Sequence, residues 1–201
     1  KRVLHSLISS RVDGLLVSTS RETDRSDHFK PILEKGIPLV FFDRIMEDLN
    51  ASQVFTENYE VALEGTEHLI AQGCKRIAIM AGPQHIFTSR NRFRGYLEAL
   101  RRNNLPIQES YIVHSHYVSN RVEESTRYLI NLPQPPDAVF AINDYTAIEM
   151  MHIMKRNGLK IPQDIAILGF NNETMCNFVE PSLSSIDHPA HDMGAAAAEI
   201  L

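Results

Sequence analysis

The 201-residue chain alternates short apolar runs with longer segments of helical periodicity, and this alternation restricts its possible folds more than any other feature. Several runs are apolar at nearly every position, which is typical of strands covered on both faces. Strands that alternate with helices predict βαβ units in a mostly parallel, doubly wound α/β sheet. The expected strands are residues 14–18, 39–43, 77–82, 111–114, 138–143, 165–170 and 183–186.

The segments between these strands repeat apolar residues at helical spacing. Gly36, Gly73 and Gly158 follow three of them, in the position where glycine ends a helix. The opening residues 3–10 also have a helical pattern and lead into a strand. A lobe that starts in this way lacks its first strand, so we expect a fragment of a longer protein. The expected later helices are residues 27–35, 59–72, 89–103, 119–131, 144–157 and 190–201.

Composition limits the compartment and the partners. No apolar run approaches the ~20 residues of a membrane span, and the opening segment lacks the cleavage site of a signal peptide. Two cysteines, Cys74 and Cys176, do not form a disulfide framework, which favours a reducing compartment. The net charge of −5 and the scattered basic residues argue against a nucleic-acid surface within these residues. We therefore expect a cytoplasmic protein with no membrane partner.

Polar side chains follow four of the expected strands. Asp43 follows the second, Arg90 and Arg92 lie beyond the third, and Asn143 and Asn171 end two later ones. Ligands bind at the carboxyl ends of parallel strands, so these residues predict a binding edge. Carboxylate, guanidinium and amide groups suit neighbouring hydroxyls, above all those of a sugar. Asn143, Asp144 and Asn171 also suit helix caps, and each alone is better explained as a cap.

The two arginines are unusual because they start the expected helix 89–103. A cation in the first turn is unfavourable by roughly 0.3–1 kcal/mol, which suggests that Arg90 and Arg92 meet a negative or hydrogen-bond-rich partner. Helical geometry does not choose between them. Phe170, at the end of another strand, has the type and place to stack on a sugar ring, with packing as an equal alternative.

Other chemistries lack their residues. The dinucleotide, nucleoside-triphosphate and serine-hydrolase motifs are absent, and nothing resembles a catalytic acid, base or nucleophile set, so we expect neither an enzyme nor a cofactor. His114 and His116, like His188 and His191, have metal-compatible spacing. No Cys or carboxylate completes either pair into a metal-ligand motif, and we expect no metal site.

A series of motifs in order resembles a known family, the effector-binding core of LacI-type bacterial transcription regulators, which is related in fold to periplasmic sugar-binding proteins. The resemblance covers essentially all 201 residues. The motifs are VDGLLVS (12–18), GIPLVFFDR (36–44), EGTEHLIAQGCKRIAIMAGP (64–83), SRNRFRGYLEAL (89–100), PDAVFAINDYTAIEMM (136–151), GLKIPQDIAILGFNN (158–172) and PSLSSIDHPAHDMGAAAAEIL (181–201).

The resemblance implies two α/β lobes with an effector bound between them. Residues 1–55 would form part of the N-terminal lobe, 56–187 the C-terminal lobe, and 188–201 a crossover back to the first. The family's effector contacts would fall on Asp43, Arg92, Asn143 and Asn171, with Arg90 as a neighbour of Arg92. Asn171 departs from the family, which commonly has Asp there.

The resemblance also implies a mechanism and partners. A sugar or related small polar metabolite would close the lobes and so control operator DNA binding by an N-terminal helix-turn-helix that is not in these residues. Family members pair core with core, so we expect a homodimer, with a surface that includes residues 3–10 and their neighbours near 27–35. The alternative is a periplasmic sugar-binding protein of a transport system.

Overall fold

The computed structural model describes residues 2–114 and 119–201, and the chain divides into two compact units. Unit 1 contains Lys1–Thr56, His85–Thr88 and Pro189–Leu201, and unit 2 contains Glu57–Gln84 and Ser89–His188. Each unit has a parallel sheet with helices, which confirms the expected α/β class.

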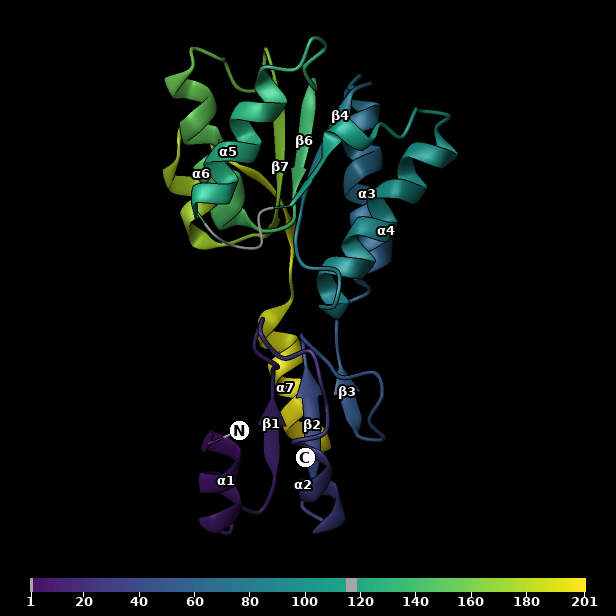
Figure 1. The fold of residues 1–201 in the computed structure, drawn as a ribbon, viewed down its shortest axis with the longest axis vertical. Helices are drawn as coiled ribbons and strands as arrows, with labels where there is room; N and C mark the ends of the chain where they lie inside the picture. The colour runs from purple at the N-terminus through teal and green to yellow at the C-terminus, as the bar shows by residue number, and fades with distance from the viewer. Residues whose placement is uncertain (1, 115–118) are drawn as a thin grey trace. The chain divides into compact units, whose positions relative to one another are not determined.

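Unit 2 is built on a five-stranded parallel sheet with strand order β5-β4-β6-β7-β8 (Figure 1). Its central strands are apolar and buried along most of their length because helices cover both faces. The strands are β4 (Ile77–Ala81), β5 (Ile112–His114), β6 (Ala138–Ala141), β7 (Ala166–Asn171) and β8 (Ser184–Asp187).

The helices of unit 2 form a layer on each side of this sheet, α5 and α6 on one side and α3 and α4 on the other (Figure 1). Each layer encloses its own apolar core: Leu129 and Met150 lie in the first, and Tyr96 and Phe140 in the second, all fully buried. The helices are α3 (Asn58–Ala71), α4 (Phe87–Arg102), α5 (Ser119–Ile130) and α6 (Asp144–Arg156), with short 3-10 turns η1 (Glu109–Tyr111) and η2 (Thr174–Phe178).

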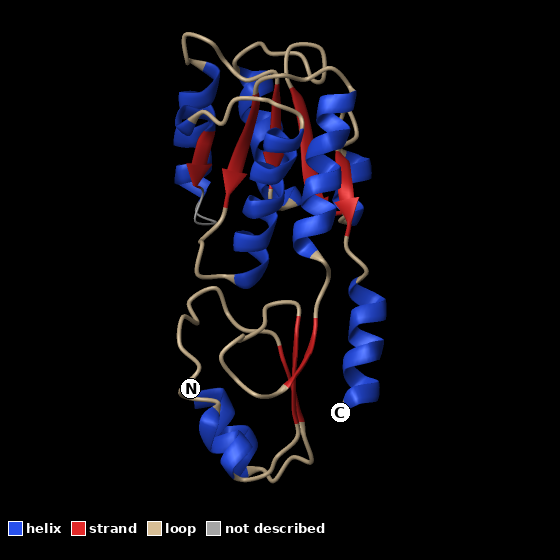
Figure 2. Ribbon diagram, turned by 90° about the vertical axis from the view of Figure 1, so that its right-hand side faces the viewer, coloured by secondary structure: helices blue, strands red, loops and turns tan. Residues whose placement is uncertain are grey.

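Unit 1 has a three-stranded parallel sheet with order β1-β2-β3. Helices α1 and α7 lie on opposite faces of it (Figure 2), and α7 contacts β2 and β3. Phe41 and Ile32 are the fully buried centre of its apolar core. The elements are α1 (Arg2–Ser9), β1 (Leu15–Val17), α2 (Lys30–Glu34), β2 (Leu39–Phe42), β3 (Ser52–Val54) and α7 (Ala190–Ile200).

The structure confirms the glycine stops and corrects several details. Gly36, Gly73 and Gly158 all have left-handed backbone angles, with φ of 68°, 94° and 83°. Strand β3 was not expected. Phe29 and Ile32, two apolar residues of the proposed dimer surface near 27–35, are buried in the core of unit 1 and are therefore not available to a partner.

Helix α4 begins at Phe87, two residues before the expected start. Arg90 therefore lies in its first turn, as expected, but Arg92 lies in the second turn. The unfavourable dipole position applies to Arg90 alone. The role of Arg92 has to be judged from its contacts.

Candidate functional site

Arg92 is a buried and tightly held charged residue at the carboxyl edge of the unit 2 sheet. Its side chain is only 6% exposed. Nε donates a hydrogen bond to Asn58 Oδ1 (2.8 Å), and Nη1 donates to the carbonyl of Ile142 (2.6 Å). The guanidinium carbon lies 3.4 Å from the ring centroid of Phe170, a cation–π geometry. A buried arginine held in this way has one fixed orientation, which is what a preorganised binding group needs.

These contacts place Arg92 at the ends of two neighbouring strands. Ile142, whose carbonyl it binds, follows β6 and precedes Asn143, while Phe170 lies in β7 and precedes Asn171. Strands β6 and β7 pair in parallel, so their carboxyl ends lie at the same edge. The structure therefore brings Arg92, Asn143 and Asn171 to one edge, the arrangement that the strand pattern predicted.

Asn143 is both a cap and a polar group at this edge. Its backbone is extended, with φ −158° and ψ 159°, and Oδ1 accepts a hydrogen bond from Thr146 N (2.8 Å) at the start of α6. Within the described residues, Nδ2 has no hydrogen-bond partner, and the side chain is half-buried. The cap thus occupies the oxygen of the amide and leaves its N–H groups as donors.

Asn171 ends β7 in a rare backbone conformation. Its φ is 116° and that of Asn172 is 54°, two consecutive left-handed residues that are not glycine. Such conformations are concentrated at functional sites. The side chain of Asn171 is half-buried and has no hydrogen-bond partner within the described residues. Its amide can both donate and accept at this edge.

Phe170 and Arg90, two other residues expected to contact a ligand, occupy positions that are explained by the fold. Phe170 is fully buried, and one face of its ring supports the Arg92 guanidinium, so packing accounts for its contacts in unit 2. Arg90 lies in the first turn of α4 and is half-buried. Phe170 contributes to the edge indirectly, by supporting the Arg92 guanidinium. Arg90 lies two residues before Arg92 on the same helix.

Asp43 belongs to unit 1, at the carboxyl end of β2, so the strand pattern was wrong to place it on the same sheet edge as Arg92, Asn143 and Asn171. It has a left-handed φ of 57°, its N–H donates to the carbonyl of Val54 (3.0 Å), and its carboxylate pairs with Arg44 (3.6 Å). A cavity of ≈ 220 Å³ lies beside this strand end. Its lining residues are Thr19, Thr23, Asp24, Arg44, Ile45, Met46, Glu47, Asp48, His85, Ile86 and Phe87.

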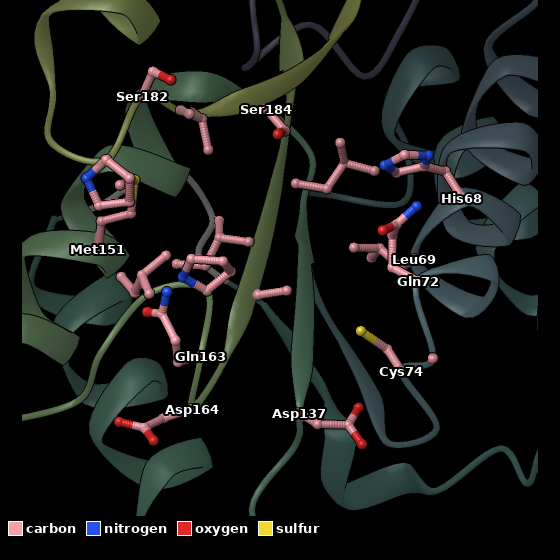
Figure 3. A pocket seen from close by; sticks show the side chains of 18 residues that line it. His68, Leu69, Gln72, Cys74, Asp137, Met151, Gln163, Asp164, Ser182 and Ser184 are labelled. Atoms are coloured by element: carbon pink, nitrogen blue, oxygen red, sulfur yellow. The ribbon is translucent and has the colours of Figure 1, made fainter.

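A larger cavity of ≈ 610 Å³ lies at the opposite edge of the unit 2 sheet, where Asp137, Ala166 and Ser184 mark the amino ends of three strands. Figure 3 shows His68 and Cys74 on one side of these strands and Met151 and Gln163 on the other. No sequence pattern predicts this cavity, because no residue type marks the amino ends of strands.

Two carboxylates line that cavity, and both have partners: Asp164 accepts a hydrogen bond from the backbone N–H of Lys160 (2.7 Å). Asp137 accepts hydrogen bonds from the backbone N–H groups of Lys75 and Arg76 and pairs with the Arg76 guanidinium (3.6 Å). Burial raises the pKa of the Cys74 thiol, which makes it a poor nucleophile at neutral pH. These groups stabilise the turn before β4 and β6, and the cavity has no arrangement that suggests catalysis.

The described residues also lack the grouped ligands of a metal site and a helix that could span a membrane. Within residues 2–114 and 119–201, no three His, Cys, Asp or Glu side chains are grouped so as to hold a metal ion. His116, one of the residues with metal-compatible spacing, lies outside the described residues. None of the helices in the described part of the chain is long and apolar enough to cross a bilayer.

Sequence reasoning missed the residues that hold the site together. Asn58, which starts α3 and binds Arg92 Nε, is 34 residues away in the chain, and the Ile142 carbonyl is 50 away. Neither the Asn58 side chain nor the Ile142 carbonyl lies in a sequence motif that would predict its contact with Arg92. Asp144 has the sequence position of an ordinary helix cap, but it is fully buried and has partners on β8 and in the loop after β7.

Known proteins resemble the chain over its whole length. The profile of the family described as "Periplasmic binding protein-like domain" matches residues 66–201. The "HTH-type transcriptional repressor CytR" of Escherichia coli K12 is 32% identical over 202 residues, which cover 100% of this chain and 58% of that protein. The chain thus spans less than two thirds of this curated relative.

Solved structures agree in fold. A regulatory protein of the LacI family from Chloroflexus aggregans superposes with a TM-score of 0.88 at 31% identity, over 98% of this chain and 71% of that one. The transcriptional regulator CelR, in complex with cellobiose, superposes with a TM-score of 0.88 at 28% identity, over 100% of this chain and 61% of that one.

Proposed function

Since the chain belongs to the periplasmic binding protein-like domain family, in the branch of the LacI-type regulators, we propose that it binds a small effector that controls transcription. The observation that carries the proposal is the fixed Arg92, tied to the ends of β6 and β7 beside Asn143 and Asn171. A buried cation lies at the carboxyl edge of a parallel sheet, together with the Asn171 amide and the Asn143 Nδ2, which have no hydrogen-bond partner within the described residues, and this combination supports a binding site.

The chemistry of these groups supports a carbohydrate or a related polar metabolite. Guanidinium and amide N–H groups donate to hydroxyl and ring oxygens, and the Asn171 amide can also accept. The structural relative CelR is solved in complex with cellobiose, a disaccharide. Asn171 replaces the acid common in the family, so a guest here gains no ionic acceptor at that position.

The proposed mechanism is closure of the two units on the guest. An effector that contacts Asp43 of unit 1 as well as Arg92, Asn143 and Asn171 of unit 2 stabilises whichever state allows all four contacts. It shifts the equilibrium only by its difference in affinity between the two states. Coupling of this kind is typically ~1–3 kcal/mol.

In the intact protein, closure would change how a helix-turn-helix domain presents itself to operator DNA, and the cores would pair as a homodimer in the cytoplasm. This role needs no catalysis, and the edge holds no acid, base and nucleophile set within the described residues. The named relatives are transcription regulators, which favours this role over a periplasmic transport receptor.

Removing the Asn171 amide tests the proposal. Titration calorimetry with cellobiose, glucose, ribose and galacturonate should show saturable binding of at least one sugar to the chain. Asn171→Gly removes the amide and suits the φ of 116°, so binding should weaken at least tenfold while the fold is kept.

Asn104→Gly is the matched control, because Asn104 is exposed and also left-handed (φ 54°) but lies after α4, remote from the edge in sequence. It should bind the sugar as the unchanged chain does. Absence of binding by every sugar, or equal affinity of the Asn171→Gly variant, would contradict the proposal.

A further inference from the structure

Asp144, the first residue of α6, is a fully buried carboxylate directly after Asn143. Oδ1 accepts a hydrogen bond from Ser185 Oγ on β8 (2.6 Å), and Oδ2 accepts one from the backbone N–H of Glu173 in the loop after β7 (2.8 Å). One carboxylate therefore joins three elements: the start of α6, edge strand β8 and the loop that begins at Asn171.

The Asp144 carboxylate packs closely against Gly169 and Cys176. A methyl group on Gly169 of β7 would collide with Asp144 Oδ1, so glycine allows the close approach of strand and carboxylate. The Cys176 thiol also lies against Asp144, and burial together with this carboxylate raises the thiol pKa to about 11. A buried charge is expensive without hydrogen bonds, and here the helix N-terminus and the donors stabilise it.

Ser185 extends the link to the residue after Asn171. Its Oγ donates to Asp144 and accepts the N–H of Asn172 (3.0 Å), and Asn172 Nδ2 donates to Asp187 Oδ1 (3.0 Å). Asn171 and Asn172 are the two consecutive left-handed residues, a conformation that persists only when the surrounding structure fixes it. The hydrogen bonds to Asn172 and Glu173 supply that constraint.

We infer that Asp144, acting through Ser185, is a positioning residue for the effector site: it fixes the Asn143 and Asn171 amides relative to one another without touching the guest. The inference rests on the proposed function for its consequence, but its geometry is independent of it. Asn143 adjoins Asp144 in the chain, and Asn171 adjoins the two residues that the Asp144–Ser185 pair holds.

The first test needs no ligand. Side-chain amide resonances of Asn143 and Asn171 in ¹H–¹⁵N spectra should shift or broaden in Ser185→Ala and in Asp144→Asn. Ser184→Ala is the matched control, because Ser184 is the exposed neighbour on the same strand and has no hydrogen bond through its side chain within the described residues. Unchanged Asn171 resonances in both site variants would overturn the inference.

The second test measures affinity in a double-mutant cycle. The probe is cellobiose or, where cellobiose does not bind, the tightest sugar of the panel. Ser185→Ala should weaken binding about tenfold in the unchanged chain and have little effect in the Asn171→Gly background, because it acts through that amide. Equal losses in both backgrounds, or the same loss in Ser184→Ala, would overturn the inference.

The two proposals fail differently. If no sugar binds the unchanged chain, the proposed function fails, while the resonances of Asn143 and Asn171 still decide the positioning role. If a sugar binds and Ser185→Ala leaves its affinity and the resonances unchanged, the positioning role fails and the binding function stands.

Discussion

The Arg92 guanidinium lies 3.4 Å from the centroid of the Phe170 ring and donates to the carbonyl of Ile142, so one side chain connects the ends of β6 and β7. The ring is fully buried beneath it. These contacts hold the ends of β6 and β7 in a fixed arrangement, next to Asn143 and Asn171. Arg92 is therefore part of the fold as well as of the proposed site, and we expect its removal to have two separable consequences.

We expect Arg92→Lys to lose sugar binding and to lower the free energy of unfolding by about 1–3 kcal/mol. Lysine keeps the charge but cannot reproduce the planar fork, so Asn58 Oδ1 or the Ile142 carbonyl loses its donor while buried. Urea unfolding and calorimetry measure the two effects. Arg94→Lys, at an exposed position on the same helix, should change neither by more than a few tenths of a kcal/mol.

A matched pair of glycines tests helix packing. A methyl group on Gly95 of α4 would collide with the carbonyl of Tyr59 on α3, whereas Gly194 in α7 has open space around it. Gly95→Ala should therefore lower the free energy of unfolding by about 1–3 kcal/mol. Gly194→Ala should raise it by about 0.5–1 kcal/mol through helix propensity. Thermal or urea unfolding decides, and equal effects of the two substitutions would contradict the close approach of α3 and α4.

Tyr96 links stability to alkaline pH. It is fully buried, its hydroxyl donates to the carbonyl of Ile77 (2.8 Å), and burial raises the phenol pKa above its ordinary value. The folded chain keeps the phenol neutral while the unfolded chain ionises it, so this contribution is complete below about pH 10 and is lost as pH rises beyond it.

We therefore expect Tyr96→Phe to cost about 1 kcal/mol at neutral pH and to flatten the decline of unfolding free energy above about pH 10. Urea unfolding across pH 8–11 is the measurement, within roughly the range where a phenol titrates. The exposed Tyr128 provides the control, since Tyr128→Phe should leave the decline unchanged. Parallel curves for all three proteins would show that Tyr96 ionises as easily in the folded state.

The sequence was sufficient for most of the fold because buried strands and apolar helix stripes are local patterns. The apolar runs of β4 and β6 can only be read as buried strands, and the apolar stripe that includes Tyr96 can only be read as the inner face of a helix. Strand β3 was missed because Ser52–Val54 is three residues long, has a polar centre in Gln53 and is never fully buried. Its pairing with β2 is decided by tertiary contact.

For the candidate site as well, some positions could be predicted from local sequence patterns and others depend on tertiary packing. Positions after strand ends follow from sheet direction, which is why Asn143 and Asn171 at the ends of strands, and Arg92 on the helix that follows β4, could be predicted to lie at one edge. Their supports could not, because Asn58 and the Ile142 carbonyl meet Arg92 only after the strands and helices have packed. The buried state of Asp144 was hidden for the same reason, since a carboxylate at a helix start has the sequence of an ordinary cap.

Asn143 allows the cap and the binding role to be separated. Asn143→Ser keeps an oxygen that can accept from Thr146 N but removes the Nδ2 donor, so stability should stay within about 0.5 kcal/mol while sugar affinity falls about three- to tenfold. Asn143→Ala removes both groups, and it should bind as weakly and also lose about 1 kcal/mol of stability. Urea unfolding and calorimetry on the same two variants distinguish the roles, because a serine variant with unchanged affinity would leave Asn143 as a helix cap alone.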